Sequence, residues 1–382
     1  MDKENFKILF LIDELLIGGT ENQLILLAER LPRESFEPVI GVLRETPYQK
    51  TLELKTSIEN LNWSGAPLVK NFSLLWKIKN YLDKEKFDIL QTHFVDSTIY
   101  GAWAARLCRK RPYLITTRRN LYYWVEDKPM SFRFLRHTVH WTDRILVNSR
   151  KVFEECQRRE NIPPEKITLI PNAIEVERFN GISTEEAKKA IRLDGRQPVI
   201  GVVANFRPIK GLLSFLDAAG LIARQIPEAQ FVLVGKGPQE EELRTRCQEL
   251  GIQDRVKFLL DYPDIPMAMA AFDVAVQPSL SESFSNVLLE YMAAGKPIVA
   301  TRVGDAERII EDEREGLLVN PNNPEGLADA VIELCKNRNK SVQFGKLSQE
   351  KVVANWSFEG IMKNYHQLYE TIIKDVKSYD IR

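Results

Sequence analysis

Short runs of apolar residues alternate along this chain with stretches in which apolar positions recur every three or four residues. The first run, 6–12, is interrupted only by Lys7 and is followed by a pair of glycines. Leu24, Leu27 and Leu31 then lie at helical spacing. Continuous apolar runs are typical of buried strands, and a spacing of three and four is typical of amphipathic helices. The opening segment therefore predicts a strand, a glycine turn and a helix.

The same unit recurs through the first half of the chain. Further strands are predicted at 39–43, 88–92, 113–116 and 145–147, and helices at 72–82, 98–108 and 150–159. Strands that alternate with helices favour a parallel sheet covered by helices on both faces.

Prolines then interrupt the pattern. Pro163, Pro164 and Pro171 are followed by a segment without clear period, 173–183, which we interpret as an interdomain linker. After it the alternation restarts. Strands are predicted at 199–204, 231–234, 256–260, 274–277 and 298–301, and helices at 211–224, 240–250, 287–294, 327–335 and 358–374. The chain is thus predicted to hold two α/β halves of similar size, each with a doubly wound sheet that binds ligands at the carboxyl ends of its strands.

Composition narrows the class of protein. The chain has 382 residues with 53 Lys and Arg against 53 Asp and Glu, so its formal net charge is zero and nucleic acid is not an expected partner. Its 44% hydrophobic and 28% charged residues are those of a globular protein. The four scattered cysteines show neither a disulfide framework nor zinc spacing. No apolar run is long enough to span a bilayer, so we expect a cytoplasmic protein, soluble or peripheral to the inner face of the membrane.

The most informative string of residues starts at Ser279 and runs to Pro297. A strand ends at Pro278, a polar loop carries Glu282, and a helix that begins near Ser285 carries Glu290 about one turn in. Helix N-termini offer unpaired amide groups and a partial positive charge, which suits an anion. An acidic residue at such a place also has a plainer interpretation, because it stabilises the helix dipole.

Taken whole, the string resembles the Glu-x7-Glu signature of family 4 glycosyltransferases, which are retaining enzymes of the two-domain fold called GT-B. The resemblance extends over almost the entire chain through a series of shorter segments. These are 8–13 with Gly18-Gly19-Thr20-Glu21, then 88–93, 147–149, 170–174, 206–211, 234–238 and 316–319. It implies two Rossmann-like domains that face each other across a cleft. The acceptor-side domain would be 1–178, closed by the C-terminal helix 358–382, and the donor-binding domain 179–357.

The resemblance also implies roles for residues of the donor domain. Lys210 and Arg207 would hold the diphosphate and stabilise charge on the leaving group. Asn205 stands where the family usually has arginine, so Arg207 would replace it. Glu290 would accept hydrogen bonds from the ribose hydroxyls and Glu282 would contact the transferred sugar. The amide groups of Phe284, Ser285 and Asn286 would lie near the sugar or the phosphates.

For the remaining candidate binding residues, a purely structural role explains the sequence as well as a role in ligand binding does. Gly235 and Gly237 would allow the backbone to approach the nucleotide, or they form a tight turn. Gly18 and Gly19 would admit a phosphate or sugar, or they only link strand and helix. His93, at the end of a buried strand, would orient the sugar or the acceptor, or it is a structural histidine.

The function implied is transfer of a sugar from a nucleotide diphosphate, with UDP favoured, to a hydroxyl of a glycan or lipid-linked acceptor in the synthesis of a cell-surface polysaccharide or glycolipid. No Asp-x-Asp occurs, so no metal site and no cofactor are expected. Two alternatives stay open, namely a nucleotide-sugar epimerase or phosphorylase of the same fold, and a non-catalytic nucleotide-sugar-binding protein.

The segment 106–159 departs from the neutral average. It holds fourteen Lys and Arg against five Asp and Glu, interleaved with Tyr122, Tyr123, Trp124, Phe132, Phe134 and Trp141. Such a segment could contact an anionic membrane or an anionic glycan. It could also be a solvated helix face with aromatic residues in the core.

Overall fold

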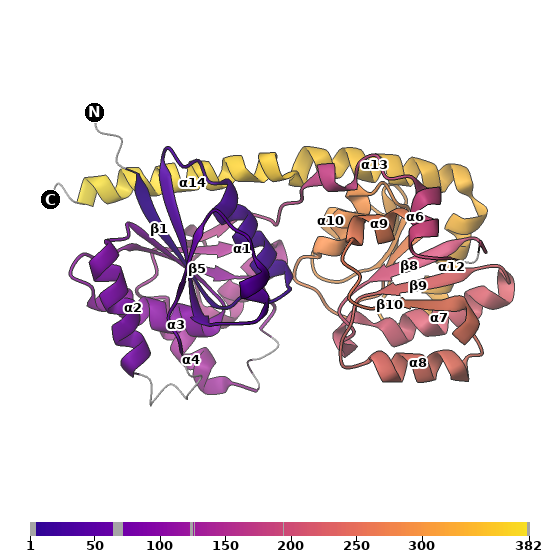
Figure 1. The fold of residues 1–382 in the computed structure, drawn as a ribbon, viewed down its shortest axis with the longest axis horizontal. Coiled ribbons are helices and arrows are strands. Elements are labelled where there is room, and N and C mark those ends of the chain that lie inside the picture. Colours follow the sequence, from indigo (N-terminus) through magenta and orange to yellow (C-terminus); the bar gives the residue numbers. More distant parts are fainter. Residues whose placement is uncertain (1–4, 64–71, 123–124, 126, 194, 380–382) are drawn as a thin grey trace. The chain divides into compact units, whose positions relative to one another are not determined.

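The computed structural model describes residues 5–63, 72–122, 125, 127–193 and 195–379, and the chain divides into two compact units. The first unit comprises Met1–Asn172 and Ile361–Arg382, and the second comprises Ala173–Gly360 (Figure 1). The domains predicted from the sequence have slightly different boundaries, after residue 178 and before residue 358.

The first unit is built on a parallel sheet of seven strands. Their order across the sheet is β3 (Ser57–Asn60), β2 (Phe36–Arg44), β1 (Phe6–Glu14), β4 (Ile89–His93), β5 (Tyr113–Arg118), β6 (Arg144–Val147) and β7 (Ile167–Leu169). In the register, Ile8 of the central strand β1 lies opposite Pro38 on one side and Ile89 on the other. The strand order reverses direction between β1 and β4, which makes this the point where a doubly wound sheet binds its ligand.

Helices cover both faces of this sheet. They are α1 (Gly19–Arg30), α2 (Phe72–Glu85), α3 (Val95–Leu107), α4 (Pro129–Thr138), α5 (Arg150–Glu155) and the C-terminal α14 (Phe358–Tyr379), which belongs to this unit from Ile361 on. Successive strand residues point to opposite faces. Leu90 therefore packs in one apolar cluster with residues of α2 and α3, whereas its neighbour Gln91 is hydrogen-bonded to Tyr369 of α14.

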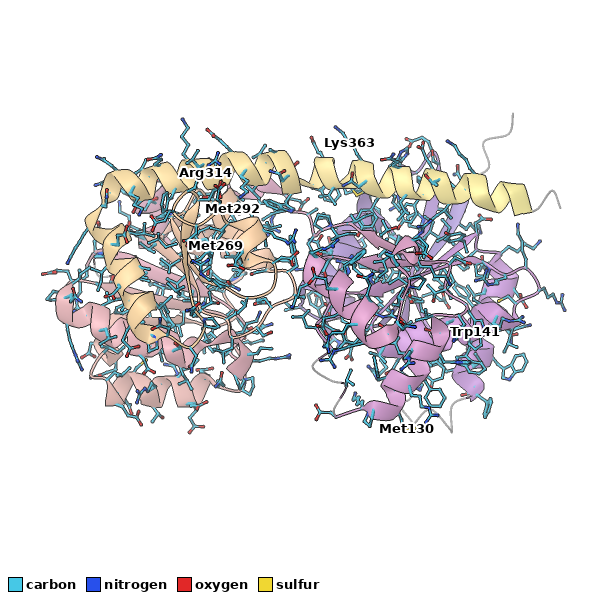
Figure 2. All side chains as sticks on the ribbon, turned by 180° about the vertical axis from the view of Figure 1, so that it is seen from behind. Met130, Trp141, Met269, Met292, Arg314 and Lys363 are labelled. Carbon is cyan, nitrogen blue, oxygen red and sulfur yellow. The ribbon has the colours of Figure 1, made fainter. Side chains whose placement is uncertain are left out.

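The second unit repeats the plan with six parallel strands. Their order is β10 (Val256–Leu259), β9 (Gln230–Val234), β8 (Val199–Val203), β11 (Val274–Gln277), β12 (Ile298–Thr301) and β13 (Gly316–Val319). The helices are α6 (Thr184–Ala190), α7 (Leu212–Gln225), α8 (Glu240–Glu249), α9 (Ile265–Ala270), α10 (Asn286–Ala293), α11 (Ala306–Ile309), α12 (Pro324–Lys336) and α13 (Arg338–Trp356). Two apolar clusters form the core, one with Met269 and Met292 (Figure 2) and one with Phe215 and Phe231. The two-sheet α/β architecture predicted from the alternation is confirmed.

The segment 173–183, which lacked a period and was interpreted as a linker, is packed into the second unit. Ile174, Val176 and Phe179 are buried in its core. The amide of Ile174 donates to the carbonyl oxygen of Trp356 at 2.9 Å, and that of Phe358 donates to the carbonyl oxygen of Ile174 at 2.8 Å. The segment forms one short turn of 3-10 helix, Val176–Phe179, whose three-residue repeat is too short to produce a recognisable pattern.

Candidate active site

The predicted donor residues gather where the second sheet reverses its strand order, between β8 and β11. The loop after β8 carries Asn205, Arg207 and Lys210, and the loop after β11 carries Glu282. Both loops leave the carboxyl edge of the sheet, which is where this class of sheet binds ligands. The fold thus brings together residues that are more than seventy positions apart in the sequence.

Lys210 and Glu282 are in direct contact. The Nζ of Lys210 lies 2.5 Å from the Oε1 of Glu282, and both side chains are largely shielded from solvent. The same carboxylate oxygen accepts a hydrogen bond from the hydroxyl of Ser279 at 2.9 Å and a longer one from the amide of Gln277 at 3.5 Å. Glu282 is therefore held from three sides, and its position does not depend on a flexible loop.

Close backbone packing keeps these two loops together. The amide of Leu280 donates to the carbonyl oxygen of Ile209 at 2.8 Å. Gly211 has a φ of +66°, and a Cβ at this position would lie 2.0 Å from the carbonyl oxygen of Pro278. Only glycine allows both the left-handed conformation and this approach, so Gly211 fixes the loop of Lys210 against that of Glu282.

Arg207 and Asn205 differ from Lys210 in their exposure. Both side chains are exposed at the carboxyl edge, and no ion pair involving Arg207 is found among the residues that the structure describes. A cation that is not neutralised at such an edge is suited to bind an anionic ligand. The substitution of the family's usual arginine by Asn205 thus leaves one arginine in this loop.

The helix α10 begins next to Glu282, as predicted. Phe284 and Ser285 are buried, Asn286 is the first helical residue, and the side chain of Ser285 does not cap the helix. The amide groups of this first turn are oriented toward the helix N-terminus, where an anion is stabilised. Glu290 is half-buried, and burial raises the pKa of its carboxyl to about 7, an effect that Arg178 partly offsets.

The packing of the backbone explains why glycine is required at Gly235 and Gly237. A Cβ at Gly235 would lie 2.0 Å from the carbonyl oxygen of Ala204, and one at Gly237 would lie 2.4 Å from that of Phe206. The amide of Phe206 also donates to the carbonyl oxygen of Lys236 at 2.8 Å. The two glycines therefore let the loop after β9 pack against the loop after β8, on the same edge as Lys210.

In the first unit the candidates lie at the corresponding edge. Gly18 precedes α1 with an extended backbone, and Gly19 is its exposed first residue. His93 ends β4 and is fully buried. Its Nε2 lies 3.2 Å from the amide nitrogen of Gln91 and its Nδ1 lies 3.4 Å from the hydroxyl of Thr117. Burial, together with Arg119, lowers the pKa of His93 well below its usual value, so the ring is neutral at pH 7.

A pocket opens at this edge of the first sheet. It is lined by Thr20, Phe94, Val95, Thr117, Arg118, Arg119, Asn120, Tyr122 and Leu135. Arg118 is neutralised by Glu160 through two hydrogen bonds of 2.7 and 2.9 Å. Arg119 instead donates to two uncharged groups, the side-chain oxygen of Asn172 at 2.7 Å and the hydroxyl of Tyr365 at 3.2 Å. The pocket is therefore polar, and Arg119 contributes a guanidinium group to its lining.

Three groups at the two edges were missed in the sequence. Ser279 and Gln277 fix Glu282, and the Ser-x-x-Glu spacing before the helix is a signal that could have shown the first of them. Asp13, at the end of β1, accepts from the amide of Ser97 at 2.6 Å and so caps α3. Burial and the neighbouring Asp96 raise the pKa of Asp13 to about 7. Its partner is 84 positions away, so no local pattern reveals this role.

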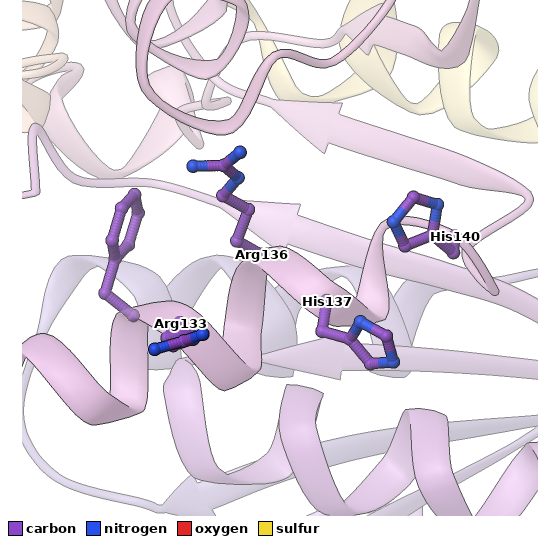
Figure 3. Close-up of a pocket in the computed structure, with 5 residues that line it drawn as sticks. Arg133, Arg136, His137 and His140 are labelled. Carbon is purple, nitrogen blue, oxygen red and sulfur yellow. The ribbon is translucent and has the colours of Figure 1, made fainter.

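The basic segment 106–159 is less uniform than its composition suggests. Arg111, Arg118, Arg158 and Arg159 are paired with carboxylates. On α4 the situation differs. Arg133, Arg136 and His137 of this helix, and His140 just after it, are exposed around a surface hollow that the half-buried Phe132 also lines (Figure 3). No ion pair of these four exposed side chains is found in the described part of the chain. Met130, labelled in Figure 2, is 59% exposed on the same helix. Tyr123 and Trp124 lie outside the described residues.

Neither a metal centre nor a membrane-spanning helix is found in the described ranges. No group of three or more His, Cys, Asp or Glu in these ranges is arranged to hold a metal ion. None of their helices is both long and apolar enough to cross a bilayer.

Comparison with known families accounts for most of the chain. Residues 17–178 match the family profile "Glycosyltransferase Family 4", and residues 183–351 match "Glycosyl transferases group 1". The two matches fall on either side of the segment 179–182, so each unit is recognised separately.

Curated relatives match over most of their own length. The N-acetyl-alpha-D-glucosaminyl L-malate synthase of Bacillus anthracis is 26% identical over 81% of both chains. A UDP-Gal:alpha-D-GlcNAc-diphosphoundecaprenol alpha-1,3-galactosyltransferase of Escherichia coli is 25% identical over 93% of this chain and 94% of its own.

Solved structures show the same fold. HepE of Anabaena, crystallised with UDP, superimposes with a TM-score of 0.84 over 96% of this chain and 100% of its own at 22% identity. Sucrose-phosphate synthase of Thermosynechococcus elongatus gives a TM-score of 0.82 over 97% and 100% at 23% identity. With two parallel Rossmann-like sheets, this architecture and both family profiles, the chain belongs to the family 4 glycosyltransferases of the GT-B fold and is a glycosyltransferase.

Proposed function

We propose that this enzyme is a retaining glycosyltransferase that moves a sugar from a UDP-sugar to a hydroxyl of an anionic, glycan or lipid-linked acceptor. The observation that carries the proposal is the contact between Lys210 and Glu282 beside the uncapped N-terminus of α10. This arrangement places a cation and helical amide groups, which stabilise a leaving diphosphate, next to a carboxylate that can bind sugar hydroxyls.

The assignment of roles follows from charge and position. Lys210 and the exposed Arg207 bind the diphosphate and stabilise the negative charge that grows on it as the glycosidic bond breaks. Glu290, one turn into α10, binds the ribose hydroxyls in its ionised form. The burial that raises its pKa to about 7 makes this group sensitive to pH in the physiological range.

The chemistry requires no nucleophile from the protein. The acceptor hydroxyl attacks the anomeric carbon from the face that the diphosphate leaves, the new glycosidic bond forms as the old one breaks, and the leaving phosphate oxygen takes the hydroxyl proton. In this scheme His93 transfers no proton; its ring, with a partner on each nitrogen inside the first unit, has a positioning role.

The choice of donor and acceptor is supported by the relatives. HepE was crystallised with UDP, and the Escherichia coli relative uses a UDP-sugar. The acceptors in the relatives' names are a malate, a diphosphate-linked lipid and, for a relative in Corynebacterium urealyticum, an inositol phosphate. All three are anionic, and the pocket of the first unit is lined by the cationic side chain of Arg119.

A ligand screen tests the donor. UDP, GDP and ADP are added separately, and the thermal midpoint is measured. We expect UDP to raise it most, since a ligand that binds only the folded state stabilises it by mass action. A second assay measures release of UDP from UDP-sugars with and without acceptors. The anomeric configuration of the product, read by NMR, should match that of the donor. Inversion would overturn the retaining mechanism.

The same assays separate the alternatives. An epimerase or phosphorylase would convert the sugar nucleotide without an acceptor hydroxyl. A binding protein would show the thermal shift but release no UDP with any sugar nucleotide. Absence of any shift with all three nucleotides would overturn the proposed donor site itself.

We further propose that α4 meets the anionic surface of a membrane that carries the acceptor. Arg133, Arg136 and His137 of α4 and the neighbouring His140 are exposed without acidic partners within the described residues (Figure 3). The same helix carries the exposed apolar side chain of Met130. Basic residues next to a bilayer each contribute about 1 kcal/mol of attraction to anionic lipids.

Vesicle sedimentation tests this contact. The protein should bind vesicles that contain phosphatidylglycerol and not vesicles of phosphatidylcholine alone, and binding should fall with added salt. Arg133→Glu with Arg136→Glu should abolish it. Arg150→Glu with Arg158→Glu serves as a matched control, because these two arginines are already paired with Glu154 and Glu155. Equal loss in both double variants would contradict a role specific to α4.

A further inference from the structure

A chain of buried polar side chains links the C-terminal helix to the wall of the first unit's pocket. The hydroxyl of Tyr369, on α14, donates to the Oε1 of Gln91 at 2.8 Å. The amide nitrogen of Gln91 lies 3.2 Å from the Nε2 of His93, whose Nδ1 lies 3.4 Å from the hydroxyl of Thr117. Thr117 lines the pocket at the end of β5.

The partners at the two ends determine the direction of every bond in this chain. The hydroxyl of Thr117 donates its hydrogen to the carbonyl oxygen of Thr92 at 2.9 Å, so toward His93 it can only accept. The Nδ1 of His93 must then carry the proton, and its Nε2 must accept from the amide of Gln91. The carbonyl oxygen of Gln91 consequently faces Tyr369, whose hydroxyl donates to it.

All members of the chain are removed from solvent. Tyr369, Gln91 and His93 are each 0% exposed, and Thr117 is 5% exposed. Water cannot replace a missing partner at such depth without cost, so loss of one donor leaves its acceptor buried and unpaired. The low pKa of His93 agrees with this arrangement, since an imidazolium could not accept from Gln91.

We propose that Tyr369 and Gln91 are positioning residues for the acceptor pocket: through His93, held as the neutral Nδ1–H tautomer, they fix the hydroxyl of Thr117 at the pocket wall. The C-terminal helix, far from the strands in sequence, thereby determines the geometry of the acceptor side. The link to acceptor binding rests on the proposed function, whereas the tautomer of His93 does not.

Removal of the first donor should loosen the chain at its buried end. In Tyr369→Phe the carbonyl oxygen of Gln91 loses its donor, whereas the bonds from Gln91 to His93, from His93 to Thr117 and from Thr117 to Thr92 can persist. The amide of Gln91 is then held on one side only, so the ring of His93 and the hydroxyl of Thr117 are positioned less firmly.

Nitrogen NMR of the full-length protein reads the tautomer directly. The chain has only four histidines, and a His93→Asn variant identifies the signals of His93. Wild-type protein should show the proton on Nδ1, unchanged between pH 6 and pH 8, and Tyr369→Phe should keep it there, because the three remaining bonds of the chain do not involve Tyr369. Tyr365→Phe is the matched control, because its hydroxyl lies one turn away on the same helix and contacts Arg119 instead. In this variant His93 should keep its proton on Nδ1.

Kinetics test the link to the pocket. Tyr369→Phe should raise the KM for the acceptor roughly three- to tenfold, the value of about one net hydrogen bond. Its affinity for the nucleotide should stay unchanged, and Thr371→Ala, which removes an exposed hydroxyl of the same helix, should change neither. Gln91→Met provides a second variant if Tyr369→Phe does not fold.

Two results would overturn the proposal. A proton on Nε2 in the wild type would contradict the directed chain, whether or not the enzyme is active. An unchanged acceptor KM in Tyr369→Phe would limit the chain to a structural role. Absence of any activity of the wild-type enzyme with UDP-sugars would instead contradict the proposed donor. The tautomer of His93 found by NMR would remain valid in that case.

Discussion

At the scale of single residues, the donor edge of the second unit depends on opposite charges in contact. The Nζ of Lys210 and the Oε1 of Glu282 lie 2.5 Å apart. Lys210→Met removes the cation that would stabilise the leaving group, so kcat/KM should fall roughly a hundredfold, as for other losses of a single stabilising donor. Release of UDP measures this loss.

The matched control for that variant is Lys257→Met, on β10. The Nζ of Lys257 donates to the carbonyl oxygen of Arg192 and is remote from Glu282 in the strand order. Its activity should equal that of the wild type. Similar losses in both variants would show that the effect is not specific to the edge.

Glu290 makes a separate prediction about pH. Burial raises the pKa of its carboxyl from 4.5 to about 7 in the folded state. Between these values the folded chain keeps a proton that the unfolded chain has lost, so this group makes the free energy of unfolding fall as pH rises from about 4.5 to about 7. Glu290→Gln cannot ionise and should flatten that dependence. Urea unfolding at a series of pH values measures it.

A control for this series is Glu325→Gln, at the exposed start of α12. It should leave the pH dependence as in the wild type. In the same experiments Glu290→Gln should weaken nucleotide binding at pH 8, where the wild-type carboxylate is ionised. Equal affinity would refute the assignment of Glu290 to the ribose.

At the scale of elements, the loops after β8 and β11 are held together by close backbone packing. Gly211 and Gly181 both have a left-handed φ, of +66° and +72°, but only Gly211 has a backbone oxygen in the way of a Cβ. Gly181→Ala should cost about 1 kcal/mol of unfolding free energy, the cost of the backbone conformation alone. Gly211→Ala should cost about 2 kcal/mol more, because the loops must move apart.

Chemical denaturation and UDP titration of the two variants check this prediction. Gly211→Ala should also lose affinity for UDP, whereas Gly181→Ala should not. Equal free energies of unfolding in the two variants would show that the close approach of the loops after β8 and β11 does not contribute to stability.

The bounds of individual strands and helices show what local sequence patterns can and cannot predict. Strands such as β11 and β12 were predicted to the residue, because a buried parallel strand is a continuous apolar run. The helix predicted over 150–159 instead ends as α5 at Glu155 and continues as a wider turn through Cys156–Glu160. Glu160 there binds Arg118, a contact over 42 positions that no local period contains.

Part of the candidate site could likewise be predicted from the sequence, and part of it could not. The clustering of Lys210, Glu282 and the start of α10 could be predicted, since each follows a strand of one parallel sheet. The hydrogen bonds of the His93 ring could not be predicted, because one of them reaches Thr117 on the neighbouring strand β5. The chain from Tyr369 was equally hidden, since its first two members are 278 positions apart.

At the scale of the whole molecule, the first unit is assembled from both ends of the chain. Ile361, Tyr365, Tyr369 and Ile372 of α14 are at most 6% exposed within it. Burial of one large apolar side chain contributes about 1.5–3 kcal/mol, so four together are comparable to the whole stability of a domain. A chain that stops at Gly360 should therefore keep the second unit folded and lose the first.

Hydrogen exchange checks this prediction strand by strand. In the shortened chain, amides of β1 and β4 should exchange rapidly, while those of β8 and β11 should stay protected. Protection of β1 and β4 equal to that of the full chain would show that α14 is dispensable for the first sheet.

The two-ended assembly of the first unit also has a consequence for synthesis on the ribosome. Strands β1 to β7 are translated before the second unit, yet α14, the helix that covers Phe36 and Gln91, is translated after it. The second unit, whose residues are contiguous, can fold while translation continues. The unit whose strands are made first can thus be completed only after the second unit has been made, and until α14 is synthesised its sheet keeps an uncovered apolar face on which chaperones can act.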